Sequence, residues 1–282
     1  MGSTRGRSER RHNGAMPRPP RPQVDPPPDG LRRFAALIAY DGAAFHGFAA
    51  NPGVSTVAGT IDEALSKVLS LDIVSTCAGR TDAGVHGWGQ VISFDGPAGV
   101  DTARVQHSLN RMLGPAIVVR DLSEVTPEFD ARFSAESRTY RYRILNRAFG
   151  DPFAHHLQWH VPESLDIAAM RSAARHLVGE HDFASFCRKK MVRVDDIEVE
   201  ADLTREVLAI DIDTDGDVID LWLTANAFCH QMVRSITGTL VEVGLGKRSA
   251  TSLPETIAAR DRHAAGALAP PQGLTLWSVS YG

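Results

Sequence analysis

A polar loop at residues 78–87 carries the side chains best suited to chemistry. Its sequence is Ala-Gly-Arg-Thr-Asp-Ala-Gly-Val-His-Gly, and apolar stretches precede and follow it. Glycines let a backbone approach a ligand closely, while flanking strands hold such a loop in place. Arg80 and Asp82 are one residue apart, so in an extended segment both side chains lie on one face. A neighbouring guanidinium favours the ionised carboxylate, and an ionised, positioned aspartate suits nucleophilic or base catalysis.

The same residues also fit a structural role. An aspartate in a glycine-rich turn is commonly a turn residue, and a nearby arginine is commonly its partner. On these residues alone, catalysis and turn formation both stay open.

Strands and helices alternate along the chain and must position this loop. Apolar segments predict strands at 33–40, 74–78, 90–94, 117–119 and 139–145, and a hairpin of 207–213 with 218–224. Apolar residues at helical spacing predict helices at 57–68, 104–113, 165–178 and 232–243. Thr60 and Glu63 fit a capping box near the start of the first helix. The mixture predicts an α+β fold of two domains, 31–130 with the catalytic loop and 131–282, each with mainly antiparallel sheet and flanking helices.

Composition sets limits on the class of protein. The chain has 282 residues, 43% hydrophobic and 23% charged, which excludes a wholly disordered protein. Residues 1–30 hold six arginines, seven prolines and only three acidic residues, which predicts a disordered tail with a net charge of +3. The formal net charge is −4, so the remainder of the chain carries about −7. Such an acidic body is unusual for a nucleic-acid-binding protein, and any positive surface must be gathered locally.

The three cysteines, Cys77, Cys187 and Cys229, are far apart in the sequence. Without a Cys-X-X-Cys pair they argue against a disulfide framework and a zinc ribbon, and they favour a reducing, cytoplasmic location. His155, His156 and His160 resemble no standard zinc pattern, so we expect no metal site. No apolar run is close to the length of about 20 residues that a membrane-spanning helix needs, so we expect no membrane association.

The residues Gly-Arg-Thr-Asp-Ala-Gly-Val-His at 79–86 resemble the signature of the tRNA pseudouridine synthase A family. Other segments resemble further blocks of that family in the same order, over about residues 31–282. They are Tyr40-Asp41-Gly42, Phe129-Asp130-Ala131-Arg132-Phe133-Ser134-Ala135, Thr139-Tyr140-Arg141-Tyr142, Met232-Val233-Arg234 and Ala269-Pro270-Pro271 with Gly273-Leu274.

The resemblance implies an isomerase with a pseudouridine synthase fold and an active-site cleft between its two domains. Its substrate would be uridine at positions 38, 39 and 40 of the tRNA anticodon stem-loop, taken out of the base stack for the reaction. No cofactor is implied, because the reaction involves no net redox change and no outside group.

Each site residue is carried over by its match to the family's motifs. Asp82 would be the nucleophile, attacking C1′ of the ribose or C6 of the uracil. Arg234 would pair with Asp82, and Arg80 would help open the stem and hold the flipped nucleotide. Tyr140 would stack beside the target uracil and assist proton transfer, and Leu274 would form an apolar wall of the pocket. Tyr140 as a core residue and Leu274 as a packing residue stay open as alternatives.

The resemblance also implies tRNA as the partner and a homodimer whose basic cleft spans both subunits. Local clusters are candidates for phosphate contacts. They are Arg138, Arg141 and Arg143, then Arg188-Lys189-Lys190, then Lys247-Arg248.

The chain departs from the common family pattern in three segments, at 48–53, 56–59 and 228–231. The first two lie where RNA contacts are expected, so they bear on substrate range and affinity. Two rival hypotheses remain: a non-catalytic RNA-binding or tRNA-folding protein, and the same chemistry on another RNA site. A phosphate-binding loop at 244–248 is excluded, because Val241 stands where the first glycine belongs and Arg248 replaces the hydroxyl residue.

Overall fold

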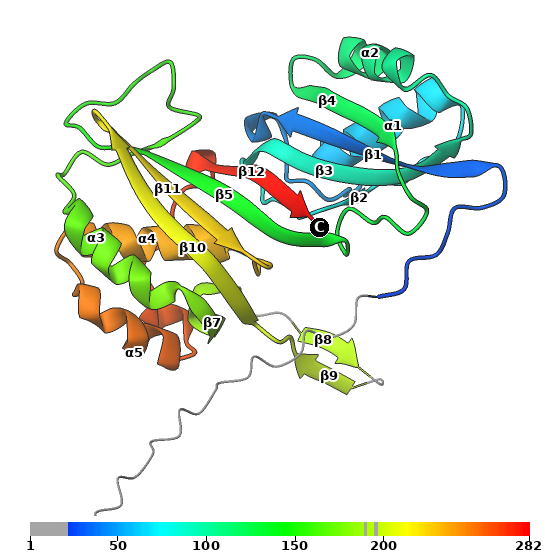
Figure 1. Cartoon of the computed structure of the whole chain (residues 1–282). Helices are drawn as coiled ribbons and strands as arrows, with labels where there is room; N and C mark the ends of the chain where they lie inside the picture. The colour runs from blue at the N-terminus through cyan, green and yellow to red at the C-terminus, as the bar shows by residue number, and fades with distance from the viewer. Residues whose placement is uncertain (1–21, 189–190, 195–196) are drawn as a thin grey trace, which may run out of the picture.

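The computed structural model describes residues 22–188, 191–194 and 197–282. Four strands build its N-terminal half: β1 (Leu31–Tyr40), β2 (Thr76–Cys77), β3 (His86–Pro97) and β4 (Ile117–Glu124). Helices α1 (Val57–Leu69) and α2 (Thr102–Leu113) lie beside them (Figure 1). Because side chains alternate between the faces of a strand, Phe34, Ala36 and Ile38 of β1 all point into one apolar core with these helices.

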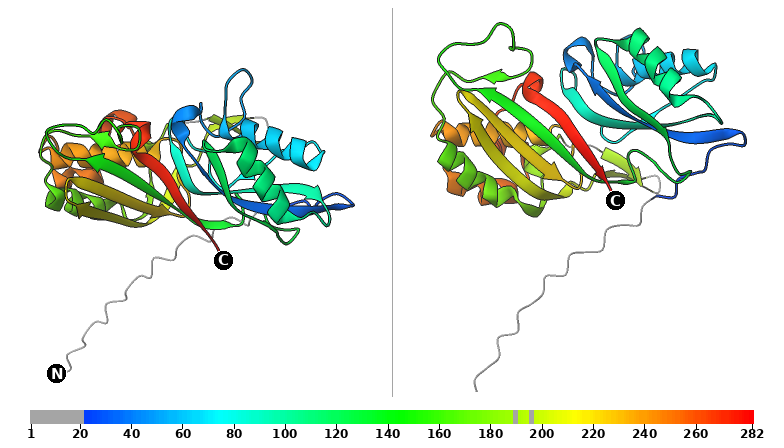
Figure 2. Two further views of the ribbon diagram at one scale, coloured as in Figure 1. Left: turned by 90° about the horizontal axis from the view of Figure 1, so that it is seen from above. Right: turned by 45° about the horizontal axis from the view of Figure 1, so that its top comes forward.

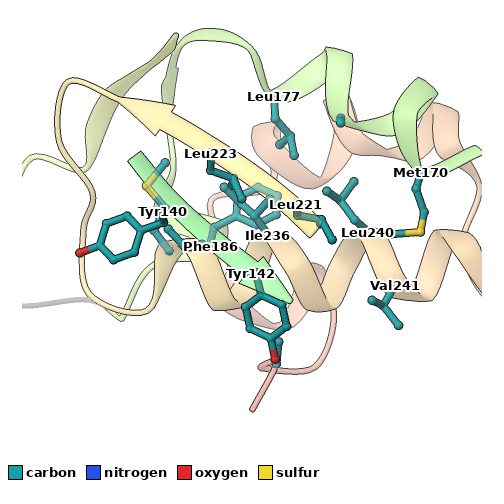
Figure 3. Packing of buried hydrophobic residues seen from close by; sticks show 14 of the residues in the cluster. Tyr140, Tyr142, Met170, Leu177, Phe186, Leu221, Leu223, Ile236, Leu240 and Val241 are labelled. Carbon is teal, nitrogen blue, oxygen red and sulfur yellow. The ribbon is translucent and has the colours of Figure 1, made fainter. Parts of the chain in front are cut away.

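The C-terminal half has a longer set of elements. Its strands are β5 (Ala135–Leu145), β6 (Trp159–His160), β7 (Gly179–Asp182), β10 (Thr204–Asp215), β11 (Val218–Ala225) and β12 (Leu274–Tyr281). Its helices are α3 (Ile167–Ala174), α4 (Met232–Gly244) and α5 (Leu253–Ala258). A separate two-stranded hairpin consists of β8 (Met191–Val194) and β9 (Ile197–Glu200). Figure 3 shows the second core, in which Tyr142, Leu221 and Leu223 of the sheet face Ile236 and Leu240 of α4.

One sheet of ten strands runs through both halves, in the order β4-β1-β3-β12-β5-β11-β10-β7. The two further strands of this sheet, β2 and β6, pair with β3 and β5. Most pairs are antiparallel, whereas β12 runs parallel to β3 and β6 runs parallel to β5. Figure 2 shows the two halves side by side with β12 at their junction. This α+β architecture with a large, mainly antiparallel sheet confirms the predicted fold class; the division at residue 130 stays a prediction.

Several predicted elements have different bounds in the structure. The N-cap of α1 is Thr56, whose hydroxyl accepts a hydrogen bond from the Gly59 N–H, so the predicted capping box of Thr60 and Glu63 is wrong. Glu63 instead pairs with Lys67 one turn later. The predicted helix 165–178 is shorter, because the chain tightens into a 3-10 turn at Arg175–Leu177. Strand β12 was not predicted, although it joins the two halves.

Residues 1–21 of the predicted tail lie outside the described residues. The described remainder, 22–30, touches the body of the protein: Arg33 donates a hydrogen bond to the Asp25 carbonyl, and the Ala98 N–H donates to the Gly30 carbonyl.

Candidate active site

Asp82 lies in the loop that leaves β2 and enters β3 at His86 and Gly87, the two residues where β3 pairs with β12. Its side chain is 23% exposed. One carboxylate oxygen, Oδ2, lies 3.1 Å from Nη1 of Arg234, and the other, Oδ1, lies 3.2 Å from Nε2 of His230. The carboxylate is therefore held from both oxygens, at the point in the sheet where the two halves meet.

Arg234 is fixed before it reaches Asp82. It lies in the first turn of α4, with a side chain only 11% exposed, and its Nε donates a 2.7 Å hydrogen bond to the Ala269 carbonyl. The Ala269 N–H donates in return to the Arg234 carbonyl. A guanidinium that is buried, oriented and paired favours the ionised form of a neighbouring carboxylate. The predicted partnership of Arg234 with Asp82 is present in the geometry.

The segment after β1 holds the backbone of the catalytic loop. The Phe48 N–H donates to the Thr81 carbonyl, and the Tyr40 hydroxyl lies 2.8 Å from the Thr81 hydroxyl. A side chain at Gly42 would place its Cβ 2.0 Å from the Val85 carbonyl oxygen, so only glycine allows this approach. The end of β1 and the segment after it therefore hold the backbone of the loop around Asp82 in place.

Tyr140 of β5 lies beside the catalytic loop, with its hydroxyl 3.7 Å from the position a Cβ on Gly79 would take. Its ring packs edge-on against Phe228 at 5.1 Å, and Figure 3 shows its hydroxyl pointing away from the labelled core residues. Burial, with smaller contributions from the nearby Tyr40 and Asp82, raises the pKa of Tyr140 well above its ordinary value. The phenol is therefore protonated at neutral pH, so in the resting site it can donate a hydrogen bond.

The remaining two predicted site residues lie in contrasting surroundings. Leu274 opens β12 opposite Tyr142 and is buried in the C-terminal core, as the packing alternative requires. Arg80 is exposed and, among the residues that the structure describes, forms no hydrogen bond or ion pair. The pairing of Arg80 with Asp82 that the loop sequence left open is not present among the described residues, where Asp82 contacts Arg234 and His230.

Comparison with known proteins identifies the family. A family model described as "tRNA pseudouridine synthase" matches residues 173–282. The "tRNA pseudouridine synthase A" of Brevibacillus brevis is 44% identical over 253 residues, which cover 89% of this chain and 100% of that protein. The chain belongs to the tRNA pseudouridine synthase A family.

A second relative agrees with this assignment. The "tRNA pseudouridine synthase A" of Geobacillus kaustophilus is 42% identical over 252 residues, covering 89% of this chain and 95% of that protein. A solved structure, "Crystal structure of the archaeal box H/ACA sRNP Nop10-Cbf5 complex", has a TM-score of 0.33 and 12% identity, over 74% of this chain and 44% of that chain, which is too low to add to the assignment. The family and the enzyme class that the sequence predicted, an isomerase, are confirmed.

In this synthase, two of the basic residues expected to contact phosphate are used inside the protein. Arg138 is buried and donates to the carbonyls of Ala78, Asn226 and Arg132. Arg143 forms an ion pair with Asp220, 2.6 Å apart. The expectation is wrong for Arg138, whose guanidinium is buried among carbonyl oxygens of the protein, whereas for Arg143, with a side chain 34% exposed, it stays a prediction.

The other predicted clusters have mixed outcomes. Arg141 stacks over Trp277 at 4.4 Å, and Arg248 pairs with Glu242 at 3.2 Å. Arg188 is exposed, whereas Lys189 and Lys190 lie outside the described residues. Arg80 and Arg132 are exposed near the catalytic loop. The positive charge of each acts to lower the pKa of the Cys77 thiol.

Two features of this synthase's site were missed in the sequence. His230 contacts Asp82 from 148 positions away in the chain, a distance that no spacing rule covers. Cys187 and Cys229 form a disulfide with their Cα atoms 5.8 Å apart, a single cross-link that the cysteine spacing did not predict. Its sequence signal was weak, because the two cysteines belong to different elements 42 residues apart.

The described part of the synthase has no group of three or more His, Cys, Asp or Glu side chains placed to hold a metal ion. Within the same residues, no helix has both the length and the apolar character needed to cross a membrane.

Proposed function

We propose that this synthase converts uridine to pseudouridine at positions 38, 39 and 40 of the tRNA anticodon stem-loop, with Asp82 as the nucleophile. The observation that carries the proposal is the carboxylate of Asp82, within the family's loop sequence and held by Arg234. A carboxylate held by a guanidinium is positioned to attack carbon as a nucleophile.

The reaction needs few protein groups. It breaks the bond between N1 and C1′, turns the uracil and forms a bond between C5 and C1′. C5 loses a proton and N1 gains one, so composition and oxidation state are unchanged and no cofactor is required. The attack by Asp82 on C1′ or on C6 gives a covalent intermediate in either route, and the neutral phenol of Tyr140 lies close enough to the loop to donate to the uracil.

The proposal includes roles for the other residues carried over from the family. Arg80, exposed and without a described partner, contacts the flipped nucleotide or its phosphate. Leu274 contributes apolar surface beneath the uracil through its packing against Tyr142. The family resemblance implies a homodimer whose basic cleft spans both subunits, and on that ground we propose a homodimer in the cytoplasm, with tRNA as its partner.

Pseudouridine mapping of an unmodified tRNA transcript tests the function. Wild-type protein should place pseudouridine at 38–40, whereas Asp82→Ala should lower the rate by at least about four orders of magnitude. Asp82→Asn keeps the size of the side chain and removes its charge, so it should be equally inactive. Both variants should stay folded, with a melting temperature somewhat below that of the wild type, because the buried Arg234 loses its carboxylate partner.

The other outcomes separate the rival hypotheses. Product at other positions keeps the chemistry and moves the substrate site. Binding without product across a panel of tRNAs would favour a non-catalytic RNA-binding protein. Wild-type rates in Asp82→Ala would overturn the nucleophile.

A further inference from the structure

His230 lies at the turn that leads into α4 and reaches the nucleophile from the side opposite Arg234. Its ring is about half exposed, and among the described residues its one polar partner is Asp82, 3.2 Å from Nε2 to Oδ1. Neither the sequence motifs nor the proposed function assigns this residue a role. We propose that His230 is a positioning residue that fixes the orientation of the Asp82 carboxylate for attack; this inference rests on the proposed function.

A single contact does not fix a carboxylate. The final torsion of an aspartate side chain is broad, so the carboxylate plane can turn about one anchored oxygen. Arg234 holds Oδ2, and His230 holds Oδ1. Each oxygen has two lone-pair directions, so one on each is used for anchoring and one stays free for the substrate. With both anchors present the carboxylate is ordered before the uridine arrives, which removes an ordering cost from the reaction.

The backbone that carries His230 is held more firmly than an exposed loop requires. Cys229, the preceding residue, is joined to Cys187, and the Arg188 N–H donates a 3.0 Å hydrogen bond to the His230 carbonyl. The following residue, Gln231, has a φ of +67°, which is uncommon for a residue with a side chain. Such a conformation persists only where surrounding contacts impose it. These contacts turn the chain so that the half-exposed imidazole reaches Asp82.

The neighbouring side chains suit a donor at this place. Phe228, two residues earlier, packs against Tyr140, so the same short segment contacts both the stacking residue and the nucleophile. Two side chains face the Asp82 carboxylate. The guanidinium of Arg234 reaches it from α4, and the imidazole of His230 reaches it from the preceding turn. The 228–231 segment differs from the common family run and still places an imidazole nitrogen 3.2 Å from a carboxylate oxygen of Asp82.

Two substitutions separate the donor from the volume of the ring. His230→Leu removes the donor, while His230→Gln keeps an N–H at a similar reach. We expect His230→Leu to lower the single-turnover rate of pseudouridine formation about 10- to 100-fold, because the Asp82 carboxylate is then held at one oxygen only and is less well oriented for attack. The dissociation constant for the same tRNA should change less than about twofold, and His230→Gln should recover most of the rate. His263→Leu, an exposed histidine far along the chain, is the matched control.

Each contrary result overturns the inference. A wild-type rate in His230→Leu removes the role, and a His230→Gln variant as slow as His230→Leu shows that the donor is not what matters. A loss confined to tRNA affinity makes His230 an RNA contact instead. An inactive wild-type protein would instead be a failure of the proposed function.

A spectroscopic measurement tests the contact without any activity. In 15N-labelled protein, the ring-nitrogen signals of His230 are identified by their loss in His230→Gln. These signals should move in Asp82→Ala, and those of His263 should not. An unmoved His230 signal overturns the inference whether or not pseudouridine forms.

Discussion

Arg80 is the member of the catalytic loop that the protein itself leaves free. It lies two residues from Asp82, is exposed, and has no hydrogen-bond or ion-pair partner within the described residues. A guanidinium with its donors unused, beside the nucleophile, suits a contact with the substrate backbone. We therefore expect Arg80 to contact bound tRNA and to contribute little to the stability of the fold.

Replacement of Arg80 by alanine should separate binding from reaction. Arg80→Ala should unfold at the wild-type temperature, because no internal contact is lost, and should still bind tRNA. Its single-turnover rate should fall about 10- to 100-fold, and Arg80→Lys should recover only part of it, since an ammonium lacks the forked geometry. An unchanged single-turnover rate in Arg80→Ala contradicts this role.

His86, at the end of the same loop, links the site to pH. Burial lowers its pKa below the ordinary value, although Asp41, 3.1 Å away, acts in the opposite direction. The Gly42 N–H donates to Nδ1 of His86, which requires that nitrogen to be unprotonated. The native state therefore holds the neutral ring.

The sign of the pH effect follows from that preference. The unfolded chain binds a proton at His86 more readily than the folded one, so the free energy of unfolding should fall as the pH drops below about 6.5. Urea unfolding at pH 7.5 and pH 5.5 measures the loss. The loss should be smaller in His86→Gln and unchanged in His263→Gln; equal losses in all three would contradict the assignment.

At the residue scale, the loop sequence marked Asp82 and Arg80 as candidates but left a structural role open, and only the family resemblance added a role for Tyr140. Arg234 could be found only through the resemblance, since it lies 152 positions from Asp82. His230 escaped even that, because its contact depends on the unusual turn at Gln231. The prediction that Arg138 contacts phosphate was wrong. The sequence identifies a positive charge on a strand, but it does not identify the three backbone carbonyls that bind this guanidinium.

At the scale of elements, α4 determines the geometry of the site. It carries Arg234 in its first turn and lies against the segment 267–269, whose Ala269 carbonyl receives the Arg234 side chain. The close approach depends on Gly238, where a Cβ would lie 1.8 Å from the Ala267 carbonyl oxygen. That oxygen belongs to the backbone and cannot rotate away.

A methyl group at Gly238 should therefore move the helix. Gly238→Ala should lower the free energy of unfolding by about 1–3 kcal/mol despite the better helix propensity of alanine, because the contact must open. Activity should fall as well, since Arg234 moves relative to Asp82. Denaturant unfolding and single-turnover rates measure both effects.

The control is Gly59→Ala in α1, where the nearest atom to the added Cβ is the Thr56 hydroxyl at 3.0 Å, a side chain that can shift. A Gly238→Ala protein as stable as Gly59→Ala would show that α4 is not held so closely.

Periodicity predicted most of the long elements, including β1, β5, α2 and α4, because each has a regular apolar face. The bounds of α3 were less accurate, since the apolar pattern continues into the 3-10 turn after it. β12 was missed because its second half alternates small polar and apolar residues that a single-sequence reading also finds in loops. Its strand character comes from its neighbours β3 and β5.

At the scale of the whole molecule, the Cys187–Cys229 disulfide ties the segment after β7 to the turn before α4. In the oxidised protein, Cys187→Ser with Cys229→Ser should lower the free energy of unfolding by about 2–4 kcal/mol. Cys77 is the remaining cysteine, and burial raises the pKa of its thiol to about 11, so it should resist alkylation in the native state. Mass spectrometry after alkylation should find one modified cysteine in the denatured oxidised protein and three after reduction; three without reduction would contradict the disulfide.

The place of β12 in the sheet has a consequence for the order in which the protein can be completed on the ribosome. β12 follows every other strand of the sheet along the chain, yet it lies between β3 and β5. Until it is synthesised, the stretches of β3 and β5 that pair with β12 lack this partner, and unpaired edges attract other chains. The nascent polypeptide carries Asp82 early and Arg234 late, and the strand that brings their halves together comes last. Under the proposed function, the site is completed only in this late step, and we expect a chain released before it to carry both Asp82 and Arg234 but to be inactive.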